Sequence, residues 1–157
     1  GTWTVIAIER AQICHGFVTL VQYDRNTMKE GIKMILGIGV DILEVGRIER
    51  ALKQKGFKEK AFTDEEIACC EQKGAHSSES YAARFAAKEA FGKALGTGLQ
   101  PGQLQQVEVL TDEKTGAPRL HVMGQLRVAA LSRQVERIHV SLSHTAENAI
   151  AQVMLEG

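Results

Sequence analysis

Three charged side chains, Asp41, Glu89 and Lys93, have the types and spacing that metal-dependent phosphate chemistry requires. Glu89 and Lys93 lie four residues apart in RFAAKEAFGKALGTG (84–98), so on a helix they share one face with Phe85. A run of alternating charges on a helix is most often a solvated face. Because phenylalanines and alanines surround these charges, the segment predicts a largely buried helix whose charged groups need partners. Glu89 and Lys93 can pair with each other or meet Asp41.

A convergence of Asp41 and Glu89 would place two carboxylates around one space. This arrangement favours Mg²⁺, which prefers oxygen ligands and keeps waters and substrate phosphates in its shell. Histidine and cysteine, the ligands of softer metals, are not clustered in the sequence. Arg84, Lys88 and Lys93 are the basic residues nearby, and their side chains suit phosphate oxygens. The combination fits a phosphoryl-type displacement, in which positioning and charge neutralisation do most of the work.

Asp41 ends an apolar strand, LGIGVD, whose side chains alternate between two faces. Gly37, Gly39 and Asp41 share one face, and the large apolar side chains share the other. One interpretation is a tight packing contact followed by a helix-capping aspartate. The other is an open slot for a ligand with the acid at its end. With Glu89 beside Asp41, we expect the glycines to keep a face beside the metal free for substrate, so that Gly39→Val would fold but lose activity.

The segment HVSLSHTAENA (139–149) places His144 and Thr145 at the end of a predicted strand, where polar side chains commonly line a site. A lone histidine beside a turn more often has a structural role. Ser143 is the neighbour of His144 in sequence, and no G-x-S-x-G elbow is present, so a nucleophilic triad is a poor interpretation.

The order of the predicted helices and strands that carry these residues indicates an α+β fold. Its strands pair mostly with neighbours in sequence, antiparallel, toward the end of the chain. In chain order, the predicted elements are a buried strand (35–42), a helix (43–55), a second helix (63–72), a long third helix (77–95), two strands joined by a turn (106–112 and 118–123), a fourth helix (124–135) and two strands joined by a hairpin turn (137–144 and 148–156).

Local signals mark the ends of the helices. Thr63 and Glu66 have the spacing of a capping box, in which each side chain satisfies an amide of the other residue. Ser77 or Ser78 is the predicted cap of the third helix. Gly96 is expected to end this helix in the left-handed conformation.

The composition is that of an ordinary globular protein: 157 residues, of which 44% are hydrophobic and 24% charged, with a formal net charge of zero. Nothing in this balance argues for nucleic acid or an anionic membrane as partner, and no apolar run is long enough to cross a bilayer. The three cysteines, Cys14, Cys69 and Cys70, form neither a disulfide framework nor a zinc motif. A reducing cytosol is therefore the expected setting.

Residues 1–33 differ from the rest of the chain. TWTVIAI and GFVTLVQY could form strands, but no positively charged region precedes the apolar part, and Glu9 and Arg10 interrupt it, so no signal peptide is predicted. MILGIGVDI, from Met34, reads as a natural start. We expect residues 1–33 to be an extension that pairs at a sheet edge or an oligomer contact.

The sequence resembles the holo-[acyl-carrier-protein] synthase family of small 4′-phosphopantetheinyl transferases. The motifs that carry this resemblance are GIGVDILEVGRIERAL, FTDEE, RFAAKEAFGKALGTG and HVSLSHTAENAIAQVMLE, which span residues 34–157 almost end to end. The resemblance implies a phosphopantetheinyl transferase-like fold, with an antiparallel sheet packed with helices. It also implies Mg²⁺-dependent transfer of the phosphopantetheine arm of coenzyme A to a serine of apo acyl carrier protein. The by-product would be adenosine 3′,5′-bisphosphate, and the setting fatty acid biosynthesis in the cytoplasm.

Carried over by motif, the resemblance implies that Asp41 and Glu89 bind the metal and that Glu89 and Lys93 are catalytic. The residues expected to contact coenzyme A are Arg84, Lys93, His144 and Thr145. The serine would attack the β-phosphorus while Lys93 holds the leaving group, and the proton acceptor stays open between Glu89 and a metal-bound water. Glu66 is assigned to the capping box alone.

The helix over 43–55 would offer Arg47 and Arg50 to the carrier protein, which is typically acidic in this family. The alternative for these residues is a plain solvated face. The resemblance also implies a homotrimer with active sites between neighbours, and sharing a site would suit a small domain with limited interior. Two other functions stay open: a module that binds coenzyme A or a carrier protein without transfer, and a different Mg²⁺-dependent phosphotransferase.

Overall fold

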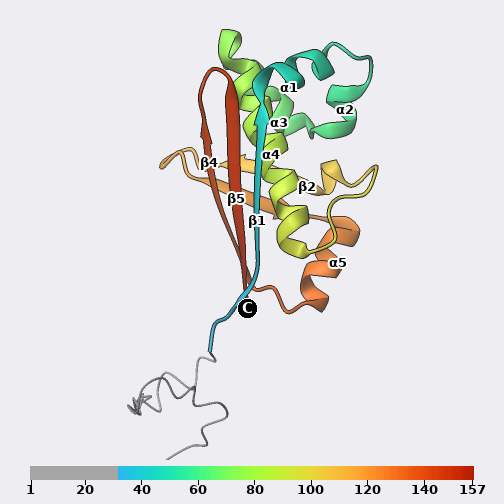
Figure 1. Cartoon of the computed structure of the whole chain (residues 1–157), viewed down its shortest axis with the longest axis vertical. Coiled ribbons are helices and arrows are strands. Elements are labelled where there is room, and N and C mark those ends of the chain that lie inside the picture. Colours follow the sequence, from blue (N-terminus) through green and yellow to red (C-terminus); the bar gives the residue numbers. More distant parts are fainter. Residues whose placement is uncertain (1–31) are drawn as a thin grey trace, which may run out of the picture. The chain divides into compact units, whose positions relative to one another are not determined.

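The computed structural model describes residues 32–157, and Lys33–Gly157 form one compact unit. The predictions for residues 1–33 therefore fall almost entirely outside the described residues. Figure 1 shows the arrangement of the elements, which are β1 (Ile35–Glu44), α1 (Val45–Leu52), α2 (Phe57–Ala61), α3 (Asp64–Glu71), the 3₁₀ turn η2 (Gly74–His76), α4 (Ser77–Leu95), the 3₁₀ turn η3 (Leu104–Gln106), β2 (Val107–Thr111), β3 (Pro118–Val122), α5 (Gly124–Ser132), β4 (Arg137–His144) and β5 (Asn148–Glu156).

Two antiparallel sheets confirm the predicted α+β class. The larger sheet has the order β1-β5-β4, and the smaller one is the β2–β3 hairpin. Asp41 pairs with Ala151 of β5, which pairs in turn with Leu142 of β4. The hairpin turn between β4 and β5 is closed by Thr145, whose amide donates to the carbonyl of Asn148 at 2.8 Å.

The long helix α4 covers one face of the larger sheet and lies beside β1 (Figure 1). Gly37 and Gly39 make this contact possible. A Cβ atom would lie 2.0 Å from the carbonyl oxygen of Ala94 at Gly37, and 1.9 Å from that of Ala90 at Gly39. The expectation that these glycines keep a face free for substrate is therefore wrong, because the backbone of α4 fills that space. The packing-contact interpretation is correct.

The opposite face of the larger sheet has no cover within the described residues. Ile38, Val40 and Ile42 of β1 are 56%, 52% and 65% exposed, and Ile150 of β5 is also exposed. The prediction of a buried strand thus holds for one face only, since alternate side chains of β1 point away from α4.

Most helix signals are confirmed, with two exceptions. Both hydrogen bonds of the Thr63–Glu66 capping box are present, and Gly96 ends α4 with a φ angle of 79°. The N-cap of α4 is His76, which makes no side-chain capping bond, so the prediction of Ser77 or Ser78 is wrong by one or two residues. Helix α2 was not predicted, because its five residues are too few for a clear apolar period. None of the helices in residues 32–157 combines the length and the hydropathy that a membrane span requires.

Candidate functional site

Asp41 and Lys93 meet at the edge where β1 passes along α4. The Lys93 Nζ donates to Asp41 Oδ1 at 2.7 Å and to the carbonyl oxygen of Val40 at 3.0 Å. The lysine side chain is half exposed, whereas the carboxylate is only 16% exposed. The strand and the helix thus bring together two of the predicted site residues from positions 52 residues apart.

Glu89 completes a cluster with Asp41 and Lys93, one turn before the lysine on the same helix. Burial raises the pKa of Glu89, and the negative charge of Asp41 raises it further, while Lys93 opposes this shift. Glu89 and Lys93 are four residues apart on α4 and so share one helix face, the face on which Lys93 reaches Asp41. Two carboxylates near each other at a partly open edge would gain from a bound cation.

The ligand set at this edge suits Mg²⁺ better than a softer metal. No group of three or more histidine, cysteine or acidic side chains with metal-binding geometry occurs in the described part of the chain. A closed, protein-only metal cage is therefore not present in residues 32–157. Mg²⁺ fits a site with one or two carboxylates, because it usually retains waters and substrate phosphates as its other ligands.

Arg84 is buried on α4, five residues before Glu89. Its guanidinium donates to Ser80 Oγ at 2.6 Å and to Cys69 Sγ at 2.9 Å, and its side chain is 6% exposed. The Nε atom has no hydrogen-bond partner, and no described carboxylate forms an ion pair with this arginine. Arg84 is thus a buried cation without an anion among the residues that the structure describes.

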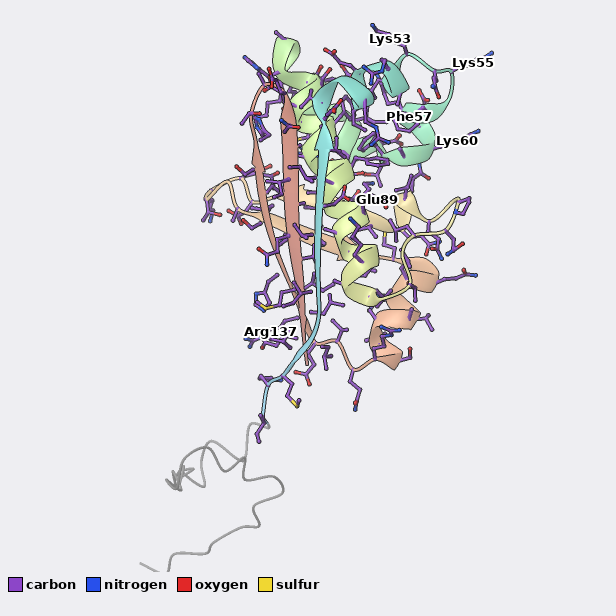
Figure 2. The ribbon with its side chains drawn as sticks, viewed as in Figure 1. Lys53, Lys55, Phe57, Lys60, Glu89 and Arg137 are labelled. Carbon is purple, nitrogen blue, oxygen red and sulfur yellow. The ribbon has the colours of Figure 1, made fainter. Side chains whose placement is uncertain are left out.

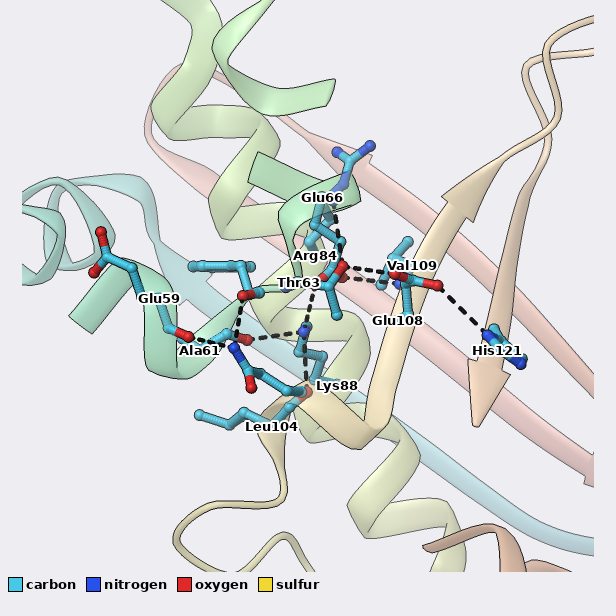
Figure 3. Close-up of polar contacts among 12 residues, drawn as sticks. Glu59, Ala61, Thr63, Glu66, Arg84, Lys88, Leu104, Glu108, Val109 and His121 are labelled. Carbon is cyan, nitrogen blue, oxygen red and sulfur yellow. Dashed lines mark hydrogen bonds and ion pairs between the residues drawn. The ribbon is translucent and has the colours of Figure 1, made fainter. Parts of the chain in front are cut away.

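Lys88 is not available for a phosphate. This lysine is fully buried and forms an ion pair with Glu66 at 2.6 Å, shown in Figure 3. The suggestion that Lys88 lies with the phosphate-binding basic groups is therefore wrong. The assignment of Glu66 to the capping box is correct but incomplete, because the same carboxylate also pairs with Lys88. The signal in the sequence was a lysine surrounded by alanines, which needs a buried partner.

His144 and Thr145 lie at the far edge of the larger sheet from Asp41. His144 ends β4 and aligns across β5 with Leu43, so two strand spacings, about 10 Å, separate β4 from β1. The imidazole Nδ1 lies 3.7 Å from Glu79 Oε2. Thr145 Oγ1 accepts hydrogen bonds from the turn amides of Glu147 and Asn148. The described chain does not bring His144 or Thr145 to the Asp41–Glu89–Lys93 cluster.

The basic side of α1 is exposed and continues into the following loop and α2. Arg47 and Arg50 form no ion pair with any other described residue. Figure 2 shows Lys53, Lys55 and Lys60 extending outward from the same end of the molecule. This surface is available to an acidic partner.

A hollow of about 470 Å³ lies elsewhere, between the start of α1, the start of α4 and the β4–β5 turn. Its walls carry four carboxylates, those of Glu44, Glu49, Glu79 and Glu147. An anionic ligand would be repelled there. The hollow contains none of Asp41, Glu89 and Lys93 and is not the candidate site.

The chain is similar to known phosphopantetheinyl transferases over almost all of its described part. The family model of the 4′-phosphopantetheinyl transferase superfamily matches residues 37–153. A holo-[acyl-carrier-protein] synthase of Treponema denticola is 45% identical over 124 residues, which are 79% of this chain and 100% of that protein. The corresponding protein of Alkaliphilus metalliredigens is 45% identical over 122 residues, or 77% of this chain and 98% of its own length.

Solved structures have the same fold. A crystal structure of a holo-(acyl-carrier-protein) synthase from Bacillus anthracis in complex with CoA (3′,5′-ADP) is 39% identical, with a TM-score of 0.65, and covers 78% of this chain and 97% of its own. The holo-[acyl-carrier-protein] synthase of Neisseria meningitidis is 31% identical, with a TM-score of 0.70, and covers 78% of this chain and 98% of its own.

Proposed function

This chain belongs to the 4′-phosphopantetheinyl transferase superfamily, and on that premise we propose that it transfers the 4′-phosphopantetheine group of coenzyme A to a serine of apo acyl carrier protein. The observation that carries the proposal is the Asp41–Glu89–Lys93 cluster in a chain that covers nearly the full length of named holo-[acyl-carrier-protein] synthases. The by-product would be adenosine 3′,5′-bisphosphate. The pathway served would be fatty acid biosynthesis in the cytoplasm.

Asp41 and Glu89 are the residues that would hold Mg²⁺. When bound, this ion would neutralise charge on the coenzyme A pyrophosphate. The serine oxygen forms a bond to the β-phosphorus, and the bond from that phosphorus to the bridging oxygen breaks with its electron pair on the bisphosphate. Lys93, already 2.7 Å from Asp41, would hold the phosphate that leaves. Glu89 is a candidate acceptor for the serine proton, because its carboxylate lies at this edge and a carboxylate can take up a proton.

Coenzyme A would be held by four residues, Arg84, Lys93, His144 and Thr145. The buried guanidinium of Arg84 supports this role, because it has no carboxylate partner and a phosphate would supply the missing anion. Two structural relatives, from Bacillus anthracis and Helicobacter pylori, were solved in complex with coenzyme A. His144 and Thr145 would contribute from a neighbouring subunit, because they lie at the opposite sheet edge from Asp41.

A homotrimer with active sites between subunits would bring the two edges together. The uncovered apolar face of the larger sheet, made by Ile38, Val40, Ile42 and Ile150, supports such an assembly. A hollow of about 120 Å³ on the same sheet, lined in part by Val40 and Ile150, would receive a side chain of the neighbour. Burying this face would also remove exposed apolar area from water.

The carrier protein would bind at α1, where Arg47 and Arg50 are exposed and unpaired among the described residues. Acidic residues of the carrier would be attracted by these charges and by the lysines that follow them. Long-range attraction of this kind speeds encounter and orients the partner before close contact forms.

The transferase unit would be residues 34–157, with residues 1–33 as an extension outside it. The extent of the family match supports this division. A chain that begins at Met34 should retain full transfer activity in the assay described next. Loss of all activity in that shortened chain would place the extension within the catalytic unit.

Mass spectrometry of apo acyl carrier protein tests the function directly. We expect the carrier to gain the mass of one phosphopantetheine group after incubation with the full chain, coenzyme A and Mg²⁺. Omission of Mg²⁺ should prevent the gain, and so should replacement of the acceptor serine by alanine. Binding of coenzyme A or carrier without any mass gain would instead identify a non-enzymatic binding module.

A further inference from the structure

The contact between α4 and β1 is unusually close. On the helix it is made largely by alanines, including Ala90 and Ala94, and on β1 it is made by Gly37 and Gly39. Helices usually gain a defined packing angle when the ridges of side chains on one element enter grooves on the other. At Gly37 and Gly39 the contact is backbone against backbone, so no side-chain ridge enters a groove at this point.

A polar anchor holds α4 from its other side, at Lys88. The ammonium group donates to Glu66 Oε2 at 2.6 Å, to the carbonyl oxygen of Ala61 at 2.8 Å and to that of Leu104 at 3.0 Å (Figure 3). An ammonium group has three N–H donors, and all three are used. The side chain is completely buried, so water cannot replace these partners.

Glu66 extends the anchor to two further segments. Its Oε2 accepts from the amide of Thr63 at 2.9 Å, and its Oε1 accepts from the amide of Val109 at 2.8 Å. The pair Lys88–Glu66 thus connects α4 with the end of α2, the start of α3, η3 and β2. Five directional bonds converge on two side chains, and three of them hold Lys88 of α4.

The pair is placed to control Glu89, the residue that follows Lys88. Successive residues on a helix are separated by about 100°, so Lys88 faces the anchor while Glu89 faces the edge of β1. A side-chain atom about 5 Å from the helix axis moves by nearly 2 Å when the helix turns by about 20°. Displacements of about 1 Å at a reacting centre can lower rates about 100-fold.

We infer that Lys88 and Glu66 are positioning residues that fix the rotation of α4 and thereby hold Glu89 in register with Asp41. The inference rests on the proposed function, in which these two carboxylates bind the metal. A buried ion pair is a poor source of stability compared with apolar packing, and its best-attested use is to specify one arrangement among several. The backbone-to-backbone contact at Gly37 and Gly39 gives such a use here, because no side chain interlocks at that point.

Lys88→Met in the full chain removes the anchor while keeping the length of the side chain. We expect the folded variant to bind Mn²⁺, measured by the EPR signal of the free ion, at least tenfold more weakly than wild type. Its kcat at saturating substrates should fall by about 100-fold, and its KM for the carrier protein should stay within about twofold, since α1 is untouched. Val107→Ala, which removes apolar side-chain volume from the core at β2, is the control. It should lower the thermal midpoint and leave the hydrogen bonds of Lys88 and Glu66 unchanged.

The controls separate this inference from the proposed function. Glu89→Gln, assayed in parallel, should lose Mn²⁺ binding. Normal binding in both Glu89→Gln and Lys88→Met would refute the metal site itself. A second outcome would overturn the positioning role alone. In it, Glu89→Gln loses Mn²⁺ binding, whereas Lys88→Met keeps the Mn²⁺ affinity and the kcat of the control Val107→Ala. If Lys88→Met does not fold, Glu66→Gln repeats the test, since glutamine has nearly the same shape as glutamate. Failure of both variants to fold would assign the pair to stability and would also overturn the inference.

Discussion

At the scale of single residues, the candidate site depends on two carboxylates and one lysine at the junction of β1 and α4. Asp41 is mostly covered and bonded to Lys93, whereas Glu89 has a raised pKa caused by burial and by Asp41. The lysine partly offsets the repulsion between the two acids. A divalent cation would do so more fully, which is the physical reason for assigning the metal to this edge.

Asp41→Ala and Glu89→Ala test the metal assignment. Each should lower phosphopantetheine transfer by at least about 100-fold, because the substrate pyrophosphate would lose its charge neutralisation. The rate should be measured over a range of Mg²⁺ concentrations, which should not restore wild-type turnover. Glu113→Ala, on the exposed turn between β2 and β3, is the matched control and should behave as wild type. Near-normal turnover in both site variants would refute the assignment.

At the scale of elements, α4 is the central helix, and its position is set by contacts with the larger sheet, α2 and α3. Its sheet side is set by glycines, its far side by Lys88 and Glu66, and its first turns by aromatic and polar contacts with α2 and α3. The helix carries Arg84, Glu89 and Lys93, so errors in its placement affect the whole candidate site.

Gly39→Val should destabilise the fold rather than block substrate. The new Cβ would lie 1.9 Å from the carbonyl oxygen of Ala90, and α4 would have to move away from β1. We expect a loss of at least about 3 kcal/mol in the free energy of unfolding, measured by urea denaturation. Gly46→Ala, in α1 with its nearest neighbour 3.5 Å away, should be neutral or gain up to about 1 kcal/mol. A stable but inactive Gly39→Val would restore the substrate interpretation.

Glu71 connects α3 with α2 and α4 and predicts a pH dependence of stability. Hydrogen bonds from Lys58, at 2.6 Å, and from Tyr81, at 2.8 Å, lower the pKa of Glu71 in the folded chain. A lowered folded pKa stabilises the fold above the pKa of the unfolded chain, and this gain disappears as pH falls through the folded pKa.

Glu71→Gln should therefore be less stable than wild type near pH 7 and equal to it in strong acid. The difference should be at most about 1 kcal/mol, because the pair is half exposed and screened by water. Thermal midpoints measured from pH 7 downward give the test, with Glu113→Gln as a control whose difference should not change with pH. A constant difference for Glu71→Gln would contradict this assignment.

At the scale of the whole molecule, two features of the larger sheet suggest that the chain forms an oligomer: predicted site residues at two separate edges, and one uncovered apolar face. The acidic cluster lies along β1, whereas His144 and Thr145 lie beyond β5 at the end of β4. The apolar side chains of the uncovered face would become buried in an assembly of identical subunits.

Subunit mixing tests whether sites are shared. Asp41→Ala and His144→Ala chains should each be inactive or nearly so alone. After co-refolding, a mixed assembly should recover a substantial part of the wild-type rate, because some sites would combine an intact Asp41 with an intact His144 of the neighbour. Sedimentation should report a trimer in each case. Absence of recovery in mixed trimers, or a fully active monomer, would refute sharing.

Charge reversal at α1 tests the carrier-protein surface. Arg47→Glu together with Arg50→Glu should raise the KM for the carrier protein by about tenfold at low salt and leave kcat nearly unchanged. The difference from wild type should shrink as salt shortens the screening length. Lys114→Glu, on the β2–β3 turn, changes the net charge equally per residue and should have little effect. An equal effect of Lys114→Glu would indicate general charge attraction instead of a surface at α1.

The sequence by itself determined most helices and strands of the described chain. The exceptions are α2, the two 3₁₀ turns, the cap of α4, and the bounds of the helix predicted over 43–55, of which Leu43 and Glu44 belong to β1 and α1 ends at Leu52. It also determined which residues share a face, because periods of 3.6 and 2 are local properties of the backbone. From those faces it predicted that Glu89 and Lys93 would lie together.

Only the tertiary structure decided which faces meet. It placed Asp41 against Lys93, filled the space beside Gly37 and Gly39 with the backbone of α4, and buried Lys88 against Glu66. These contacts join segments far apart in the chain. Whether such contacts form depends on how closely two elements approach each other and on which polar groups become buried away from water. Neither the approach distance nor the burial is a property of a single segment.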